Sequence, residues 1–269
     1  FKLKYFSQVT PVTNLITCIP EFTHSIRGVC LLDGLAGNLQ ALLFLCHSTY
    51  REHVGVEKIS EICENILNVL NLPEFQINTN DPSTLGSAEG LTGIIYCLLD
   101  PICVKIKCVS SRLSQIEKTV DFILKYYQNH TDCLDWNFGL IGAAYLAIRA
   151  NRVYENPLYL DYAHQFAQVA WEKGLGQNLS LGKGVAGIGY IFLALYHYTK
   201  MEKYLYYAVK FGQFIVENYS EISYKLSQSL FNGTPGISCY LIDLCIPAKF
   251  SFPGFQVYRD IPLDLKFLF

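Results

Sequence analysis

A unit made of a glycine turn and the apolar helix behind it occurs five times along the chain. In the clearest copy, residues 180–196, Gly184 and Gly187 lie three residues apart, and apolar and aromatic residues without proline follow them. Glycine permits the unusual dihedral angles and the close backbone contacts of a tight turn at the start of a helix. A helix that is apolar all round is typically buried on most sides. The first glycines of the five copies are Gly34, Gly90, Gly139, Gly184 and Gly233.

A second helical pattern follows the glycine-led helix in the first four copies, and it is apolar on one face only. In residues 59–70, for example, Ile59, Ile62 and Ile66 recur at helical spacing with polar residues between them. Successive copies begin 45 to 56 residues apart, so each unit is a pair of helices. Apolar inner helices and two-faced outer helices predict an all-α fold, an α/α toroid with a double ring of helices.

This architecture places the five turns on one rim of the toroid, with the residue before each first glycine facing the mouth. We expect any chemistry of the chain at these positions. An open solenoid is the alternative architecture, and the all-round apolarity of the inner helices favours closure.

The composition agrees with a large buried core and excludes several classes of protein. Of the 269 residues, 51% are hydrophobic and 16% are charged, which is too apolar for a disordered chain. The formal net charge of −2 provides no basic surface for a nucleic acid, and nothing in it indicates association with a membrane surface. No apolar run reaches the roughly 18 residues of a transmembrane helix. Neither a nucleic-acid partner nor a transmembrane segment is therefore expected.

The ten cysteines lack the spacing of a disulfide scaffold. Cys63, Cys97 and Cys239 lie within apolar helical patterns, where a free cysteine behaves as a small hydrophobic residue. We therefore predict a reduced, cytoplasmic protein.

Residues 30–269 form one predicted toroid domain, and residues 1–29 form an irregular N-terminal segment or a remnant of an earlier unit. Repeat architectures can extend one domain beyond the usual size of a single core. The chain begins at Phe1 and its one methionine is Met201, so we expect a fragment or a chain whose true start is missing.

Four motifs and a C-terminal tail carry a family resemblance. They are Leu85-Gly86-Ser87-Ala88-Glu89-Gly90-Leu91, Trp136 before Gly139-x-x-Gly142, Leu181-x-x-Gly184-x-Ala186-Gly187, Ser229-Leu230-Phe231-x-Gly233 and Pro247–Phe255. Over about Cys30 to Phe255 the chain resembles the lanthionine synthetase C-like (LanC-like) family, and the tail resembles its eukaryotic branch in particular. The resemblance implies a seven-unit α/α toroid, of which about the last five units are present here.

The resemblance also implies a zinc chemistry. LanC-like enzymes hold one zinc ion through the cysteine of a Trp-Cys-His-Gly motif and a Cys-His pair in the next unit. A fourth position stays open for the thiol of cysteine or glutathione. Zinc lowers the pKa of a bound thiol, whose thiolate then adds to a dehydroamino acid. A histidine in a Gly-Ser-Ala-His-Gly motif can handle the proton.

Each of these family positions holds a different residue type in this chain. The first zinc cysteine falls on Asn137, and the histidine after it falls on Phe138. The Cys-His pair falls on Gly182 and Lys183, and the proton-handling histidine falls on Glu89. Asparagine is a poor zinc ligand, glycine has no ligand atom in a side chain, and a lysine ammonium repels a cation. We therefore expect no zinc and no other cofactor.

The prediction from the sequence is a pseudoenzyme, a non-catalytic LanC-like relative that binds glutathione or another thiol, a peptide or a protein in its central cavity. The candidate catalytic residues are Glu89, Lys183 and Asp33. The predicted cavity-rim residues are Asp33, Glu89, Asn137, Phe138, Gly182, Lys183 and Asn232, the last at a position where the family often has glutamate.

Two alternatives remain open at the level of sequence. One is an enzyme that uses the cavity carboxylates Glu89, Asp33 and Asp135, by analogy with glycoside-processing α/α toroids. The other is a truncated, inactive paralogue. Lys183 is either a solvated rim lysine or an ammonium in the vacated metal position that pairs with Glu89 or Asp33.

Overall fold

The computed structural model describes residues 26–46, 54–71, 82–176, 178–222, 227–253 and 255. Within them every regular element is a helix, apart from an isolated bridge between Ser227 and Gly233. The all-α prediction is therefore confirmed. Most of the predicted irregular segment 1–29 lies outside the described residues, and its end, Ile26–Val29, forms the short helix α2.

Five inner helices are described, and each begins directly after the first glycine of one sequence copy. They are α3 (Leu35–Cys46), α5 (Leu91–Leu98), α8 (Leu140–Tyr154), α10 (Val185–Thr199) and α12 (Thr234–Cys245). Successive inner helices contact each other in chain order. The glycine unit thus locates the start of each of these helices.

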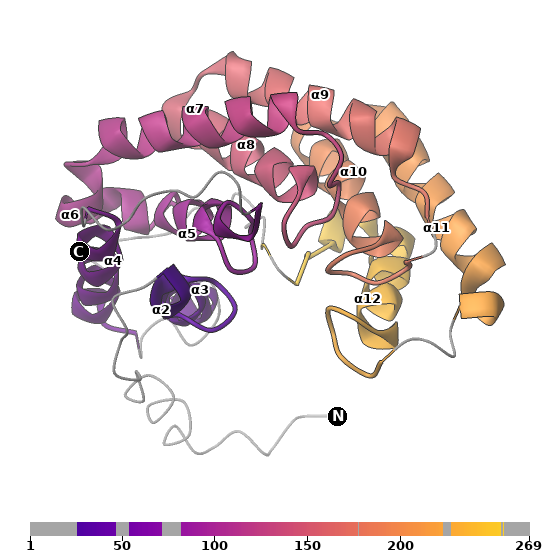
Figure 1. Ribbon diagram of the computed structural model, residues 1–269, viewed down its shortest axis with the longest axis horizontal. Coiled ribbons are helices and arrows are strands. Elements are labelled where there is room, and N and C mark those ends of the chain that lie inside the picture. The colour runs from indigo at the N-terminus through magenta and orange to yellow at the C-terminus, as the bar shows by residue number, and fades with distance from the viewer. Residues whose placement is uncertain are drawn as a thin grey trace.

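An outer layer covers the inner helices. Its members are α4 (Val56–Leu70), α7 (Leu113–Asn129), α9 (Pro157–Lys173) and α11 (Glu202–Ile222). Between the inner and outer helices lie the short helices η2 (Pro82–Thr84), η3 (Cys103–Lys105) and α6 (Lys107–Ser110), and η5 (Pro247–Lys249) follows α12. Figure 1 shows the two layers curving together from α3 and α4 to α12, which is the arrangement of an α/α toroid.

The burial of the two layers differs as the sequence predicts. All residues of α5 and the first eleven residues of α10, 185–195, are buried. In α7 only one face is buried, with Ile116, Val120 and Ile123 among its members. Apolar inner helices and amphipathic outer helices together form one continuous core.

Close backbone contact, rather than unusual dihedral angles, explains the glycine that precedes each inner helix. Gly90, Gly139, Gly184 and Gly233 are all extended, with φ between −118° and −141°, and no described glycine has a positive φ. The prediction of unusual dihedral angles is therefore wrong. A Cβ atom at Gly184 would lie 2.6 Å from the amide nitrogen of Ser180, so a side chain at this position would collide with the turn itself.

A helix that spans a membrane needs about 20 predominantly apolar residues. The longest of the described helices, α11, has 21 residues and carries charged side chains along its length. None of the described helices is both long enough and apolar enough to cross a bilayer.

Candidate functional site

Backbone hydrogen bonds join the five glycine turns into one continuous row. In each of the first four turns the residue two positions before the first glycine donates its N–H to the carbonyl of the equivalent residue in the next turn. Leu32 donates to Ala88 (3.0 Å), Ala88 to Asn137 (3.1 Å), Asn137 to Gly182 (3.2 Å) and Gly182 to Phe231 (2.7 Å). We call this row the turn ladder. It places the five turns side by side in one row and fixes their register.

The residue after each ladder position is the one that immediately precedes the first glycine. Asp33, Lys183 and Asn232 are exposed there, and Glu89 and Phe138 are half-buried. Adjoining turns therefore present two carboxylates, an aromatic ring, an ammonium and an amide along the same rim. The structure brings these five predicted rim residues onto neighbouring turns, while Asn137 and Gly182 lie one step deeper in the ladder itself.

A buried aromatic cluster holds the third turn in place. Trp136 is fully buried and stacks on Phe231 of the fifth turn, with 5.2 Å between ring centroids. The rings of Phe252 and Phe255, from the C-terminal tail, pack edge-on against Trp136 at 5.4 and 5.3 Å. The tail motif noted in the sequence therefore packs against the turns and fixes the backbone on which Asn137 lies.

Asn137 and Gly182, on adjacent rungs of the ladder, share one small space. The Asn137 side chain is only 8% exposed, and its Oδ1 atom has no hydrogen-bond partner among the described residues. A Cβ atom on Gly182 would lie 2.8 Å from this Oδ1. The asparagine thus occupies the space into which a side chain at position 182 would extend.

Lys183 extends over the neighbouring turn. Its Nζ atom lies 5.0 Å from the centroid of the Phe138 ring, a distance at which a cation and an aromatic face attract each other. Within the described residues Lys183 forms no ion pair with Glu89 or Asp33; the pairs found there are Lys58–Glu61 and Arg149–Asp100.

Asp135, on the third turn, serves the local backbone. Its Oδ1 atom accepts the N–H of Phe138 at 2.8 Å and so closes the turn. Burial raises the pKa of the Asp135 carboxyl, whereas this hydrogen bond and the positive charge of Lys183 act in the opposite direction. Its hydrogen bond to the backbone gives Asp135 a structural role in the turn.

Two cysteines that were not among the predicted site residues lie beside the rim. Burial raises the pKa of Cys133 to about 11, with a contribution from the negative charge of Asp135. Burial also raises the pKa of Cys30, and the charges of Asp33 and Glu89 add to this effect. Both groups are therefore thiols at neutral pH, and neither is an activated nucleophile. Both cysteines come a few residues before the first glycine of a turn, and this position is the sequence signal that could have identified them as neighbours of the rim.

Metal ions in proteins are held by groups of histidine, cysteine, aspartate or glutamate side chains that converge on one point. No group of three or more histidine, cysteine, aspartate or glutamate side chains within the described residues is arranged to hold a metal ion. At the three positions where the resemblance implies zinc ligands, Asn137 has an amide, Gly182 has no side-chain donor and Lys183 has an ammonium.

Comparison with known proteins identifies the family. Residues 18–257 match the family described as lanthionine synthetase C-like protein, which is most of the chain. The chain belongs to the LanC-like family. The matched range includes all five glycine turns, the turn ladder and the aromatic tail, so the resemblance seen in the motifs is confirmed.

Two eukaryotic LanC-like relatives illustrate the similarity. A zebrafish (Danio rerio) protein named glutathione S-transferase LANCL1 is 31% identical over 252 residues, which cover 84% of this chain and 62% of the relative. LanC-like protein GCL1 from Arabidopsis thaliana is 28% identical over 186 residues, covering 64% of this chain and 43% of the relative. The chain thus spans less than two thirds of the length of either LanC-like relative.

Proposed function

We propose that this chain is a LanC-like binding protein without zinc-dependent thiol addition, and that its rim of glycine turns binds a zwitterionic thiol peptide of the glutathione type. The proposal draws on membership of the family, on the printed name of the zebrafish relative, and on the chemistry of the rim. The observation that carries it is the pairing of Asn137 with Gly182.

The donor set at the three family ligand positions does not fit zinc. Structural and catalytic zinc sites use thiolate, imidazole and carboxylate ligands. Here Asn137 offers one amide oxygen, Gly182 offers no side-chain donor, and the Lys183 ammonium is cationic. Because the Asn137 side chain already fills the space beside Gly182, the two positions are matched to each other rather than to a metal between them.

The charges of the rim are complementary to a small zwitterionic peptide. Asp33 and Glu89 lie on the first two turns, and Lys183 lies on the fourth, beside the Phe138 ring. A γ-glutamyl peptide carries an ammonium and two carboxylates. We place its ammonium toward Asp33 and Glu89 and a carboxylate toward Lys183, with its apolar atoms against Phe138.

Calorimetric titration of the purified, chelator-treated protein with glutathione tests this function. We expect binding that survives methylation of the ligand's sulfur, because no metal holds the thiol. Lys183→Gln should weaken binding about tenfold or more, the effect of one lost charge-assisted hydrogen bond. Lys125→Gln, on the exposed face of α7, is the matched control. Loss of binding on S-methylation, or an equal effect of both variants, would contradict the proposal.

Catalysis is tested separately. The protein, incubated with zinc and desalted, should retain much less than one zinc per chain. In its presence, the rate of glutathione addition to a dehydroalanine peptide should not exceed the uncatalysed rate in buffer alone. Stoichiometric zinc, or turnover comparable with that of a zinc-bearing relative, would show an active enzyme.

We also propose a cytoplasmic location. All nine cysteines within the described residues are free, from Cys30 to Cys245. Free thiols of this number are typical of a reducing compartment. Expression with a fluorescent tag, followed by microscopy and cell fractionation, checks the location.

A further inference from the structure

Two buried cysteines from different units contact each other through their sulfur atoms. Cys63 lies on α4, and Cys103 is the first residue of η3, 40 residues later in the chain. Both side chains are fully buried, and their Sγ atoms are 3.8 Å apart in an S–H···S hydrogen bond. Since a disulfide has an S–S length of about 2.05 Å, the two sulfur atoms need to approach by about 1.8 Å to form one.

The contact selects one pairing among several cysteines. Cys97, on α5, is equally buried, but its thiol donates to Oε1 of Gln40 at 3.4 Å. Among the described cysteines, all of which are free, Cys63 and Cys103 are the one pair hydrogen-bonded to each other. A disulfide formed without rearrangement of the fold therefore joins these two residues.

The pair lies where two helical units meet. α4 is the outer helix beside α3, whereas η3 follows α5 in the next unit, and α4 packs against both η3 and α6. A covalent bond between Cys63 and Cys103 would therefore tie the outer helix of one unit to the connection that follows the inner helix of the next.

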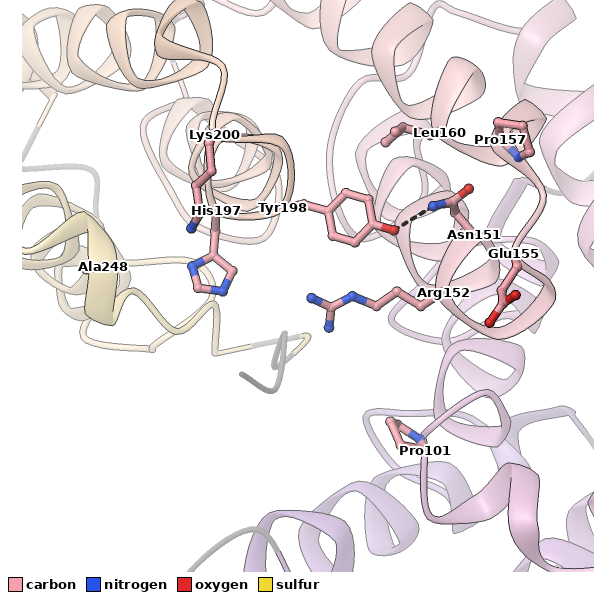
Figure 2. A pocket seen from close by; sticks show the side chains of 10 residues that line it. All are labelled: Pro101, Asn151, Arg152, Glu155, Pro157, Leu160, His197, Tyr198, Lys200 and Ala248. Carbon is pink, nitrogen blue, oxygen red and sulfur yellow. Dashed lines mark hydrogen bonds between the residues drawn. The ribbon is translucent and has the colours of Figure 1, made fainter. Parts of the chain in front are cut away.

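The segment that carries Cys103 forms part of the wall of two cavities at the C-terminal ends of the inner helices. Pro101 lines both, one of about 1020 Å³ and one of about 280 Å³, and Val104 lines the smaller. Figure 2 shows Pro101 at the edge of the larger cavity, across from residues of α8 and α10. Because η3 is a 3-10 helix of three residues, little hydrogen bonding of its own opposes local opening. A small oxidant in these cavities thus lies beside a segment whose opening exposes Cys103.

Burial also keeps the closed pair reduced. It raises the pKa of the Cys103 thiol well above its ordinary value. The thiolate is the form that reacts with oxidants, so the buried thiol reacts slowly and the opened segment reacts faster.

We propose that Cys63 and Cys103 form a reversible disulfide when the protein meets hydrogen peroxide. After η3 opens, the Cys103 thiolate attacks one peroxide oxygen, becomes a sulfenic acid and releases hydroxide, which takes up the thiol proton as water. The sulfur of Cys63 then attacks the Cys103 sulfur, and the second oxygen leaves as water. In total, two thiols and one hydrogen peroxide give one disulfide and two water molecules. A dithiol reverses the reaction by thiol–disulfide exchange.

The disulfide acts as a lock between the two units. It closes a loop across the 40 residues between the cysteines, and such a cross-link stabilises a fold mainly by restricting the unfolded chain. The lock is independent of the proposed peptide site, because none of the residues that we place around that ligand is a cysteine.

Mass spectrometry of the full chain after peroxide treatment tests the proposal. The treated protein is quenched in acid, unfolded, alkylated with N-ethylmaleimide and digested. We expect a pair of peptides joined through Cys63 and Cys103, which dithiothreitol separates, whereas Cys97 is alkylated. Cys245 is exposed, so its oxidation shows that the peroxide has acted. Full alkylation of Cys63 and Cys103 in a sample with oxidised Cys245, or a cross-link from Cys103 to Cys97, would overturn the proposal.

Urea denaturation of variants tests the lock. Peroxide treatment should lower the unfolding equilibrium constant of the natural chain at least tenfold. The effect should vanish in Cys63→Ala and Cys103→Ala and persist in Cys97→Ala, which removes an equally buried thiol. A persisting effect in Cys63→Ala, or none in the natural chain, would mean that this pair does not lock the units. The cross-linked peptides are measured in the natural chain, so that test holds even if an alanine variant does not fold.

Discussion

At the scale of single residues, Gly182 and Asn137 share a space that only one side chain can fill. A glycine in a repeat motif is usually explained by its own backbone, but Gly182 is restricted by the residue on the adjacent rung of the ladder. Trp136, the residue before Asn137, is fully buried, and Asn137 itself is only 8% exposed, so its amide has little room to move away. The two positions therefore depend on each other.

We predict that Gly182→Ala lowers the free energy of unfolding by about 1–3 kcal/mol, because the new methyl group overpacks against the Asn137 Oδ1. In an Asn137→Ala background the same change should cost about 1 kcal/mol less, which urea denaturation and a double-mutant cycle measure. Gly176→Ala is the control, since a Cβ atom there would meet nothing within 4 Å. Equal costs in both backgrounds would show that the two positions are independent.

At the scale of elements, the sequence predicts the inner helices well and the connections between them poorly. Glycine marks the start of each inner helix because a side chain there would collide with the turn, and that signal is local. The short helices η3 and α6 carry no such mark. The cavities at the helix C-termini could not be predicted, because Leu99, Val153 and Lys200 come from three different units and meet only in the folded chain.

The same limit applies to the candidate site. The repeat predicted which residues share the rim, and the ladder joins them in that register. It could not predict that Lys183 would lie over Phe138, since the direction of a long side chain depends on its neighbours. Nor could it predict that Asp135 would accept the N–H of Phe138, a detail of the geometry of one turn.

A tyrosine on α10 connects this helix to α12, and its loss should be measurable. The Tyr190 hydroxyl donates to Oδ2 of Asp243 at 2.8 Å, and the same oxygen accepts the N–H of Ser251 at 3.0 Å. We predict that Tyr190→Phe lowers the free energy of unfolding by about 1.5–3 kcal/mol, as expected for a hydrogen bond to a charged group.

Tyr145 on α8 offers a matched control for this prediction. It is equally buried, but its hydroxyl has no partner among the described residues. Tyr145→Phe should therefore change stability by less than about 0.5 kcal/mol or increase it, since it removes an unsatisfied polar group. Urea denaturation of both variants measures the difference. Similar losses for the two variants would mean that ring packing, and not the hydrogen bond, dominates.

At the scale of the whole molecule, the burial of an inner helix depends on its place along the curved double layer. α8 packs between α5 and α10, and α10 packs between α8 and α12. Residues 140–150 and 185–195 of these helices are buried without interruption. Of the described inner helices, α12 packs closely on α10 alone, and its Ile242 is 63% exposed. Each inner helix therefore depends for its burial on the neighbours that flank it.

This dependence predicts a gradient of local stability along the arc. In repeat proteins, units with a neighbour on one side only open more easily than units with neighbours on both sides. We expect backbone amides of α8 and α10 to exchange hydrogen most slowly, and those of α12, which packs closely on one described inner helix, at least tenfold faster. Hydrogen exchange of the native protein, read by mass spectrometry of peptides from each helix, measures this. Uniform protection from α3 to α12 would instead mean that the five units unfold as one, so that contacts between neighbouring helices do not set local stability in this toroid.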